Sequence, residues 1–383
     1  MSFPSNWQVC RLGDIASFHD EQRVPIKAED RAKRPGEFPY FGASGQIDSI
    51  DDFIFDGDYV LLAEDGANIL NRSSPIAFRA KGKFWVNNHA HILKATSATC
   101  NEFLLYALEA LRYERYNTGS AQPKLNKEVC ESIKLALPSK SEQEKIVEIL
   151  SDCDVGIGTI EREIESKKRS YKGACQHALS SANETRPLTE VATVLFSNVD
   201  KKQCAVQQPV MLCNYTDVFY NDFITSDLNF MESTASETES KKFALRSDDV
   251  LFTKDSETPE EIAVSAVVSE DIANLVCGYH LGIARPKDIN GGYLGVAFKS
   301  LTVRNQFSRL AQGATRFGLN LDAMHYVNIP ILPRAQQTLM AKISKEHARE
   351  IDALSLQLSL LKKLKHGLMQ QLMTGKLRVK GAS

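Results

Sequence analysis

The sequence predicts an α+β protein in which two similar globular domains are joined by two long antiparallel coiled-coil helices in a pseudo-twofold arrangement. Three observations predict it. Motifs recur in the same order about 190 residues apart, each copy mixes short β-type runs with few helices, and each copy ends in a long amphipathic helix. The copies lack the regular strand–helix alternation of a doubly wound sheet. Solenoid repeats span only ~20–50 residues, so this period indicates a duplicated domain.

The repeat keeps nearly the same register over most of each copy. The matched segments, first copy then second, are Gly57–Leu62 with Ser247–Phe252, Val86–His89 with Val276–Tyr279, Gly119–Gln122 with Gly313–Arg316, Leu137–Pro138 with Leu332–Pro333, and Leu12–Ala16 with Leu188–Ala192. The last pair has the shortest offset, 176 residues, which indicates extra residues inside the second copy. A duplicated module suits a target that itself has two halves.

Composition is that of an ordinary soluble chain. The 383 residues are 43% hydrophobic and 25% charged, with a net charge of −2. No run approaches the ~20 apolar residues that a membrane span needs, and the start lacks the pattern of a signal peptide. Eight cysteines occur without a C-x-x-C pair, so neither a metal site nor disulfides are expected. These features favour a reducing, cytoplasmic location.

Charge is unevenly distributed along the chain. Lys362–Lys380 holds six basic residues and no acid, whereas Asp217–Glu239 is rich in acidic and hydroxyl side chains. We interpret the acidic segment as a solvated loop or flexible insertion. The basic segment is either a solvated helix face or a strip that contacts phosphates.

Residues 1–138 form the first expected domain. Strands are predicted at Tyr59–Ala63, Phe84–Val86 and His91–Lys94, because these β-type runs are bounded by turn residues. One helix is predicted over Asn101–Tyr113, with Asn101 as its N-cap.

Residues 183–333 form the second expected domain. Its predicted strands include Val250–Thr253 and Ile262–Ser265, and a helix is predicted through Leu294–Leu310.

Residues 139–182 and 334–383 are the expected spacer helices. Ser141 and Glu144 have the spacing of a capping box, and Gly156 and Gly158 predict a kink or a close helix crossing. Apolar residues recur at a coiled-coil spacing near 3.5. They are Ile146, Leu150, Ile157, Ile160 and Ile164 in the first helix, and Ile351, Leu354, Leu358, Leu361, Leu368 and Leu372 in the second.

The two helices can be interpreted in two ways. They pair with one another as a spacer, or each closes the core of a domain. A second apolar stripe, Leu356, Leu360 and Leu364, predicts contact with further helices of this chain or of a partner.

These elements together resemble the DNA-specificity subunit of type I restriction-modification systems. The resemblance covers nearly the whole chain and lies in Trp7–Ile15, Phe38–Gly45, Gly57–Leu61, Gly119–Leu125, Leu137–Ile146 and Leu361–Leu377. The second copy departs from the pattern, since it lacks the early Trp and the Phe-Gly-x-x-Gly run, and its helix junction reads Pro333–Gln337.

The resemblance implies a non-catalytic subunit. Residues 1–138 and 183–333 would be target-recognition domains, each reading one half of a bipartite double-stranded DNA sequence. The helices would set the spacing and dock methyltransferase subunits, two in number. Those subunits would bring S-adenosylmethionine for adenine methylation, and restriction subunits would bring ATP, Mg²⁺ and cleavage. The chain itself would hold no cofactor.

Motifs for catalysis are missing from the sequence. There is no phosphate-binding G-x-x-x-x-G-K-[ST] loop and no Asn/Asp-Pro-Pro-aromatic motif of adenine methyltransferases. Asp248 and Asp249 with Lys254 are better explained by a turn entering a strand than by a nuclease site. His89 and His91 alternate on a predicted strand but lack a nearby third metal ligand.

Residue types that read DNA occur in two equivalent loops. Arg, Lys, Asn and Gln distinguish base edges, and hydroxyls and cations hold phosphates. The candidates are Ser120, Gln122, Lys124 and Asn126 in the first loop, and Thr315, Arg316 and Asn320 in the second. Weaker candidates are Tyr40, Ser44, Asn88 and His89 in the first domain, and Asn214, Tyr215, Lys254 and Tyr279 in the second. The alternative is that both loops are plain turns before strands.

Three other functions compete with a type I specificity subunit. One is a coiled-coil protein-interaction scaffold, another is a specificity subunit for a fused restriction-methylation enzyme, and the third is an enzyme with a site between the copies. Because net charge is near zero, we expect the isolated chain to bind DNA weakly.

Overall fold

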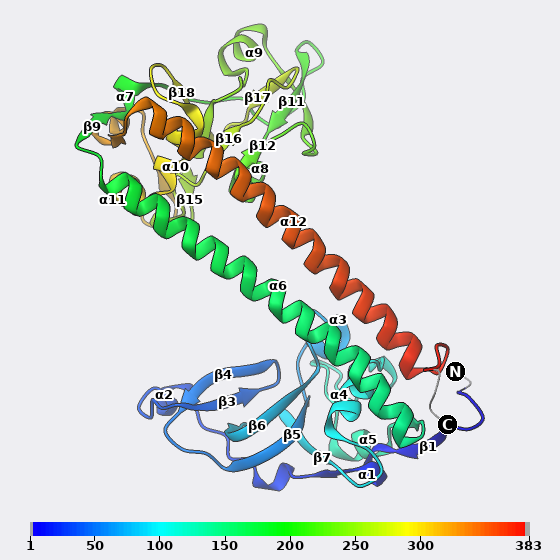
Figure 1. Cartoon of the computed structure of the whole chain (residues 1–383). Helices are drawn as coiled ribbons and strands as arrows, with labels where there is room; N and C mark the ends of the chain where they lie inside the picture. Colours follow the sequence, from blue (N-terminus) through cyan, green and yellow to red (C-terminus); the bar gives the residue numbers. More distant parts are fainter. Residues whose placement is uncertain (1–2, 380–383) are drawn as a thin grey trace. The chain divides into compact units, whose positions relative to one another are not determined.

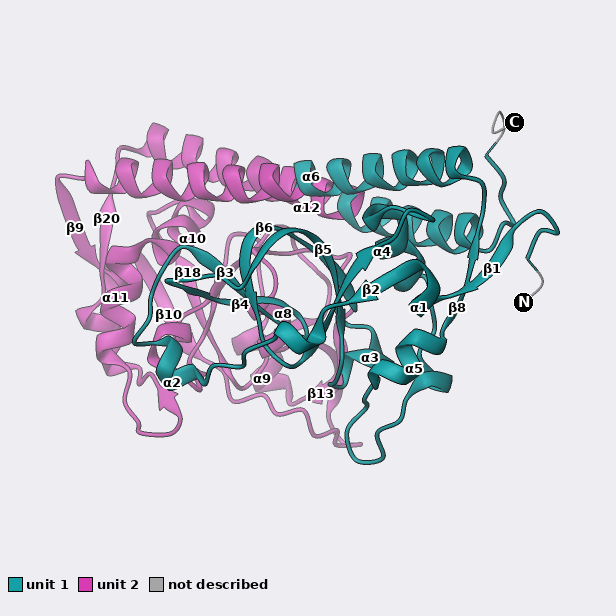
Figure 2. Cartoon of the chain, turned by 90° about the horizontal axis from the view of Figure 1, so that it is seen from below, with its two compact units in different colours: residues 1–160, 358–383 teal, residues 161–357 magenta. Residues whose placement is uncertain are grey.

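The computed structural model describes residues 3–379 and divides the chain into two compact units. Unit 1 comprises residues 1–160 and 358–383, and unit 2 comprises residues 161–357 (Figure 2). Strands and helices are mixed in both units (Figure 1). The α+β class predicted from the sequence is therefore confirmed.

Unit 1 is built on a six-stranded sheet of order β2-β7-β5-β6-β3-β4. The strands are β2 (Ala16–Phe18), β3 (Phe38–Gly42), β4 (Gly45–Ile50), β5 (Phe55–Ala63), β6 (Ala77–Val86) and β7 (Ala90–Ala95). A separate antiparallel pair joins β1 (Gln8–Arg11) to β8 (Lys134–Leu137). The pairing of β3 with β6 is parallel, whereas the central strand β5 is antiparallel to both neighbours.

Helix α4 (Asn101–Glu109) packs its apolar face into the core of unit 1, where Phe103, Leu104 and Leu108 are buried. The predicted N-cap was wrong by one residue, because the Cys100 sulfur accepts the hydrogen bond from the Phe103 amide. The Asn101 side chain instead links two strands, through the Asp58 carbonyl and the Ala95 amide. The helix also ends before Tyr113, whose hydroxyl donates to the Leu108 carbonyl.

The remaining helical segments of unit 1 are short. They are α1 (Leu12–Ile15), α2 (Ala28–Arg31), α3 (Asn68–Asn71), α5 (Lys127–Ser132), and the 3-10 turns η1 (Asp20–Gln22) and η2 (Glu114–Tyr116). Helix α1 lies between β1 and β2, and its Leu12 and Ile15 are buried.

Unit 2 repeats the strand order of unit 1. Its main sheet runs β10-β18-β14-β16-β12, so β10, β18, β14 and β16 take the places of β2, β7, β5 and β6. The strands are β10 (Ala192–Phe196), β12 (Phe223–Ile224), β14 (Val250–Thr253), β16 (Ser265–Val268) and β18 (Leu281–Pro286). As in unit 1, an entry strand β9 (Glu184–Pro187) pairs with an exit strand β20 (Asn328–Ile331), and α7 (Leu188–Val191) follows the entry strand.

The acidic segment Asp217–Glu239 is folded, contrary to the loop predicted from its composition. It includes most of α8 (Tyr215–Phe219), β12, β13 (Met231–Ala235) and the start of α9 (Glu237–Phe243). Val218, Ile224, Phe230 and Ala235 are buried in a second core, so sparse apolar residues anchor this segment. Strand β13 joins β11 (Gln208–Cys213) and β17 (Leu275–Cys277) in a three-stranded sheet among the described strands of unit 2.

Two further predictions in unit 2 need correction. Ile262–Val264 precede β16 rather than belonging to it, because Ala263 has a φ of +57° and turns the chain. The predicted helix through Leu294–Leu310 is two helices, α10 (Gly291–Lys299) and α11 (Leu301–Leu310). The break falls at Ser300, whose hydroxyl accepts the hydrogen bond from the Val303 amide and caps α11. Smaller elements are β15 (Asp255–Ser256), β19 (Phe317–Gly318), η3 (Pro259–Glu261) and η4 (Asp322–Tyr326).

The long helices are α6 (Lys140–Ser180) and α12 (Arg334–Met373). In unit 1, the Lys365 ammonium lies 2.5 Å from the Asp154 carboxylate. In unit 2, Lys167 pairs with Glu350 at 2.8 Å. Within unit 1, Gly156 also faces Leu361, and within unit 2, the Tyr171 ring stacks on His347, so partner numbers on α12 fall as those on α6 rise and the helices run antiparallel in each unit.

The start and the middle of α6 bear on two sequence predictions. A Cβ at Gly156 would lie 3.1 Å from a Leu361 methyl, which confirms a close helix crossing there. The predicted capping box was wrong, because Ser139, not Ser141, accepts the hydrogen bond from the Glu142 amide. The helix begins at Lys140, so Ser141 lies inside its first turn.

Both interpretations of the long helices hold in part. Ile146, Leu150 and Leu372 belong to the core of unit 1, so the helix ends do close a domain. Further along, Ile160 and Ile164 are buried, whereas Leu356, Leu360 and Leu364 of the second stripe are 62%, 56% and 55% exposed. Within the described residues, the second stripe is therefore more than half open to solvent.

Candidate nucleic-acid interface

Three segments of unit 1 meet at one end of the main sheet. They are the residues after β5, the residues before β7, and the loop Gly119–Asn126. The His89 Nδ1 lies 2.8 Å from the Asp65 carboxylate, which links the first two segments. The Leu125 amide donates to the Glu64 carbonyl at 2.7 Å, which links the third. Sequence candidates far apart in the chain are thus brought together.

The Gly119–Asn126 loop is held in one shape by the side chain of Asn117. The Asn117 side-chain oxygen accepts hydrogen bonds from the Gly119 and Lys124 amides at 3.0 and 2.9 Å. A Cβ at Gly119 would come within 1.8 Å of the Gln122 carbonyl oxygen, so only glycine fits. Ser120 and Gln122 are exposed on this turn. A rigid turn that presents polar side chains suits recognition of a base edge.

A buried ion pair lies under the loop. His91 is 1% exposed; its Nδ1 contacts the Asp20 carboxylate at 2.6 Å and its Nε2 the Leu125 carbonyl at 2.8 Å. Both partners only accept hydrogen bonds, so the ring carries two protons and a positive charge. Burial, the largest influence, lowers the pKa of His91, but the hydrogen bond to Asp20 and the neighbouring Cys130 outweigh burial and raise that pKa to about 10.

Unit 2 has the same arrangement of segments. The His280 Nδ1 before β18 lies 2.7 Å from the Asp255 carboxylate after β14. The Leu319 amide of the second glycine loop donates to the Lys254 carbonyl at 2.8 Å. Gly313 has a φ of +141°, and a Cβ there would come within 1.9 Å of the Arg316 carbonyl oxygen. The two units therefore present equivalent clusters, although few of the side chains are the same.

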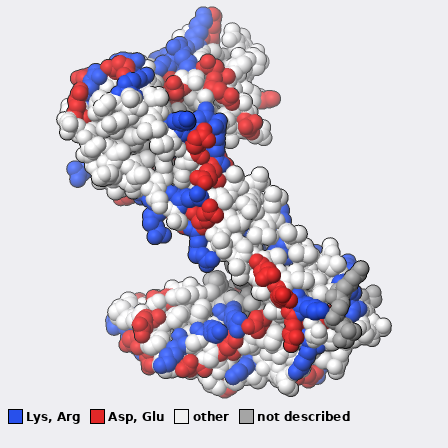
Figure 3. All heavy atoms as spheres, in the orientation of Figure 1, with Lys and Arg blue, Asp and Glu red and all other residues white. Residues whose placement is uncertain are grey.

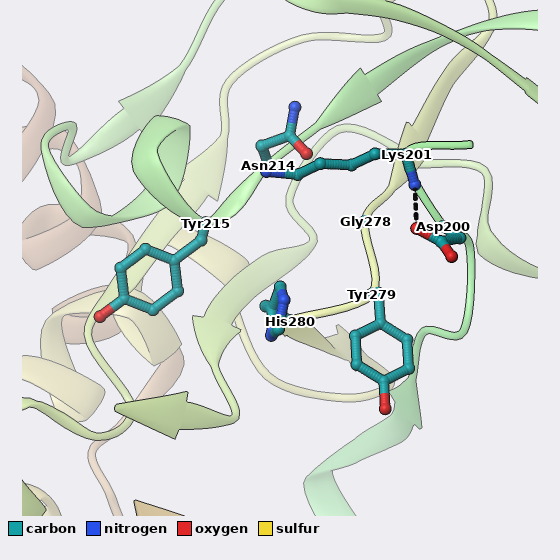
Figure 4. A pocket seen from close by; sticks show the side chains of 7 residues that line it. All are labelled: Asp200, Lys201, Asn214, Tyr215, Gly278, Tyr279 and His280. Atoms are coloured by element: carbon teal, nitrogen blue, oxygen red, sulfur yellow. Dashed lines mark hydrogen bonds between the residues drawn. The ribbon is translucent and has the colours of Figure 1, made fainter. Parts of the chain in front are cut away.

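Unit 2 also has a pocket of about 320 Å³ beside its cluster (Figure 4). Its lining residues are Asp200, Lys201, Asn214, Tyr215, Gly278, Tyr279 and His280. The predicted candidates Asn214, Tyr215 and Tyr279 thus share one site. Tyr279 meets the His280 ring edge-on at 5.1 Å and lies under the Lys254 ammonium at 4.3 Å.

Some predicted DNA contacts are occupied within the protein. The predicted contact of Tyr40 with DNA was wrong, because the Tyr40 side chain is fully buried and its hydroxyl contacts Ile26. The Lys254 ammonium donates to the Ser197 carbonyl at 2.8 Å, and burial lowers the pKa of Lys254. The Asn320 side-chain oxygen accepts the hydrogen bond from the Ala323 amide in η4, and Asn214 is 8% exposed.

The other candidates remain open to solvent. They are Ser44, Asn88, His89, Ser120, Gln122, Lys124, Asn126, Thr315, Arg316 and Tyr279, with Tyr215 half-buried. Lys124 and Arg316 also contact acids of the cluster, since Lys124 lies 3.3 Å from Glu64 and Arg316 lies 3.5 Å from Asp255. Their contact with DNA stays a prediction.

Three residues of the clusters were missed by the sequence reading: Asp65, Asp255 and His280. The motif comparison aligned His89 with Tyr279, one residue out of register. Strand pairing corrects this, because His91 pairs with Leu62 as Gly282 pairs with Phe252. His89 therefore corresponds to His280, and Asp65 to Asp255. An alignment centred on the strands at 90–95 and 281–286 would have found the pair.

The residues that could suggest a nuclease or metal site from the sequence have structural partners. Asp249 is buried and forms an ion pair with Arg285, and Asp248 occupies the predicted turn before β14 with a φ of +70°. His89 and His91 bind different carboxylates, and no cluster of three metal-ligating residues occurs within residues 3–379.

Charge on the visible face is mixed rather than separated (Figure 3). In the basic segment, Lys365 pairs with Asp154 and Arg378 with Glu142, so these two cations are engaged within unit 1. Lys380 lies outside the described residues. Across the described chain, no helix is both long and apolar enough to cross a membrane.

The two units share an equivalent strand order. Each has a polar loop cluster and contains part of the antiparallel pair of long helices. These features define a duplicated-domain protein with helical spacers. Residues 4–167 match the type I restriction modification DNA specificity domain.

Similar proteins cover different shares of the chain. A protein named as a type I restriction enzyme specificity subunit of Haemophilus influenzae is 34% identical over 36% of this chain and 35% of its own length. A Methanocaldococcus jannaschii specificity subunit is 21% identical over 98% of this chain and 94% of its own. The solved S subunit from M. genitalium has the same fold, with a TM-score of 0.60, 14% identity, and coverage of 97% of this chain and 98% of that one.

Proposed function

We propose that this chain is the DNA-reading subunit of a type I restriction-modification complex, with each unit reading one half of a bipartite duplex target. One observation carries the proposal: the same glycine loop, strand end and His–Asp pair occur at equivalent places in both units. Equivalent surfaces suit two half-sites. Side chains of the clusters would contact base edges in the major groove, and hydroxyls and cations would hold phosphates.

We further propose that the chain is not itself an enzyme. The acids and histidines of the clusters bind one another or backbone groups. These partners are structural, and none of them is a nucleophile that the acid or histidine would activate. Methyltransferase subunits would supply S-adenosylmethionine, and restriction subunits would supply ATP- and Mg²⁺-dependent cleavage. No step of either reaction needs a residue described above.

Partner docking is assigned to the second stripe of α12. Leu356, Leu360 and Leu364 are each more than half exposed, and their four-residue spacing puts them on one side of the helix. An exposed apolar stripe on a charged helix is typical of a surface that another helix covers. Two methyltransferase subunits are proposed as the partners.

Exchange of one unit tests the reading function. Residues 1–138 are replaced by the corresponding segment of a family member with a different target, and methylated sites are sequenced in cells that hold the partner subunits. We expect one half of the target to change and the other to persist. Two unchanged halves would contradict the proposal. A fused restriction-methylation partner would give the same result, and the neighbouring genes distinguish it.

A further inference from the structure

The paired His–Asp sites differ from ordinary structural ion pairs in their exposure. The His91 side chain, bound to Asp20, is 1% exposed, whereas those of His89 and His280 are 49% and 34% exposed. Their Nδ1 atoms contact carboxylates that are themselves only 22% and 18% exposed. Each ring is therefore anchored at one nitrogen, with much of its surface left to solvent.

The anchoring fixes which nitrogen carries the proton in the neutral ring. A carboxylate only accepts hydrogen bonds, so Asp65 and Asp255 keep the proton on Nδ1. Nε2 then carries a lone pair. Within residues 3–379, Nε2 of neither histidine forms a hydrogen bond. The pair leaves one acceptor with a fixed direction, as a reader of a hydrogen-bond donor requires.

Position adds to this chemistry. In unit 1, Asp65 forms a β-bridge with Lys124 of the glycine loop. In unit 2, Asp255 pairs with Gly318 at the end of the corresponding loop. His280 also lines the pocket with Tyr215 and Tyr279 (Figure 4). The same pair has thus been kept beside the same loop in two units whose other cluster residues differ.

We propose that His89 and His280 are equivalent specificity-determining residues, and that Asp65 and Asp255 are their positioning residues. This inference rests on the proposed function. Nε2 of each ring would accept a hydrogen bond from an exocyclic amino group in the major groove. The donors of this type are adenine N6 and cytosine N4, so each histidine selects one of these bases at one position of its half-site.

The test compares His89→Ala and His280→Ala by methylome sequencing of cells that hold the complete complex. We expect His89→Ala to lose about tenfold of the discrimination at one position of one half-site, and His280→Ala to do the same in the other half. The remaining positions should stay unchanged. The matched control is His177→Ala, since His177 is an exposed histidine of α6 outside both clusters.

Asp65→Asn and Asp255→Asn separate positioning from folding. An amide can hold either tautomer of the ring, so we expect a smaller loss of discrimination at the same position, with an unchanged melting temperature. These variants also keep the test open if an alanine variant fails to fold.

The outcomes that would overturn the inference are distinct. An intact motif at full methylation in both histidine variants would exclude a reading role. A uniform loss across all sequences with the motif intact would identify a phosphate contact instead. If the unaltered complex showed no bipartite motif, the proposed function itself would fall. A bipartite motif that is present in the wild type and unchanged in the variants would instead overturn only the role of the two histidines.

Discussion

At the scale of single residues, unit 1 contains a buried histidine charge that has no equivalent at the same position of unit 2. His91 links the Asp20 carboxylate to the Leu125 carbonyl, and Arg23 and Glu64 extend the network. In unit 2 the position of His91 is taken by Gly282, which lies against the Phe252 ring. The first loop therefore contacts an imidazolium in unit 1, whereas the equivalent position in unit 2 is a glycine beside an aromatic ring.

We predict that unit 1 loses stability in alkali. The pKa of His91 is raised to about 10 in the folded protein, from about 6.5 in the unfolded chain. A raised pKa gives stability that is complete below pH ~6.5 and is lost as pH rises through about 10. The groups that face His91 are Asp20 on η1, Arg23, Glu64 after β5 and Cys130 on α5. After correction for the base-catalysed intrinsic rate, hydrogen exchange at pH 9.5 relative to pH 7 should show reduced protection of the Leu125 amide, and no matching reduction at Leu319.

Replacement of His91 should have a large effect at neutral pH. Breaking a buried ion pair costs about 3–5 kcal/mol, because the remaining carboxylate is left uncompensated. We expect His91→Ala to lower the free energy of unfolding by that amount in urea denaturation. The variant Gly282→Ala would not be a neutral control, since its Cβ would meet the Phe252 ring at 2.4 Å. His177→Ala provides one, and a loss below 1 kcal/mol for His91→Ala would contradict the ion pair.

At the scale of elements, the two glycine loops are fixed by close backbone approach. We predict that Gly119→Ala and Gly313→Ala each displace one loop, because the new Cβ would overlap a carbonyl oxygen. Each variant should weaken methylation of targets by changing one half-site only. Gly173→Ala on α6 is the matched control, since nothing lies within 4 Å of its Cβ, and it should stabilise the helix by up to ~1 kcal/mol. Equal effects on both half-sites would show that the loops do not act separately.

The exposed stripe of α12 gives a second prediction at this scale. Leu356→Ser together with Leu360→Ser should leave the melting temperature of the isolated chain nearly unchanged, because both side chains are more than half exposed. Copurification of methyltransferase subunits should fall at least tenfold. The control pair is Leu150→Ser with Leu372→Ser, which replaces core residues and should lower stability first. Undiminished copurification of the Leu356, Leu360 variant would place the partner elsewhere.

Much of the element pattern could be predicted from the sequence, and the misses have physical causes. The apolar periodicity located α6 and α12, because a helical period sustained over so many residues is compatible with few structures other than a long helix. The prediction that the acidic segment is a solvated loop was wrong, because four buried apolar side chains anchor its fold. The overall composition of the segment does not reveal so few residues. The clusters were found only in part. Asp65 and His89 stand 24 residues apart, and only strand pairing brings them together.

At the scale of the whole molecule, net charge limits what the chain can do alone. A net charge of −2, with charges of both signs mixed on the face that Figure 3 shows, leaves little net positive charge to neutralise phosphates. We predict weak DNA binding by the isolated chain, and tight, salt-dependent binding once partner subunits add cations. Fluorescence anisotropy with and without the partners, at ~50 and ~200 mM salt, measures this. Tight binding by the chain alone would contradict it.

The strand pairs at the base of each unit have one more consequence. Because β1 lies beside β8, and β9 beside β20, the polypeptide enters and leaves each globular part through neighbouring strands. Such a part behaves as a cassette whose two cut points are adjacent in space. Genetic recombination at these points can substitute one globular part for another while the helices keep their sequence. Under the proposed function, such an exchange would give access to new DNA targets in addition to those reached by gradual mutation.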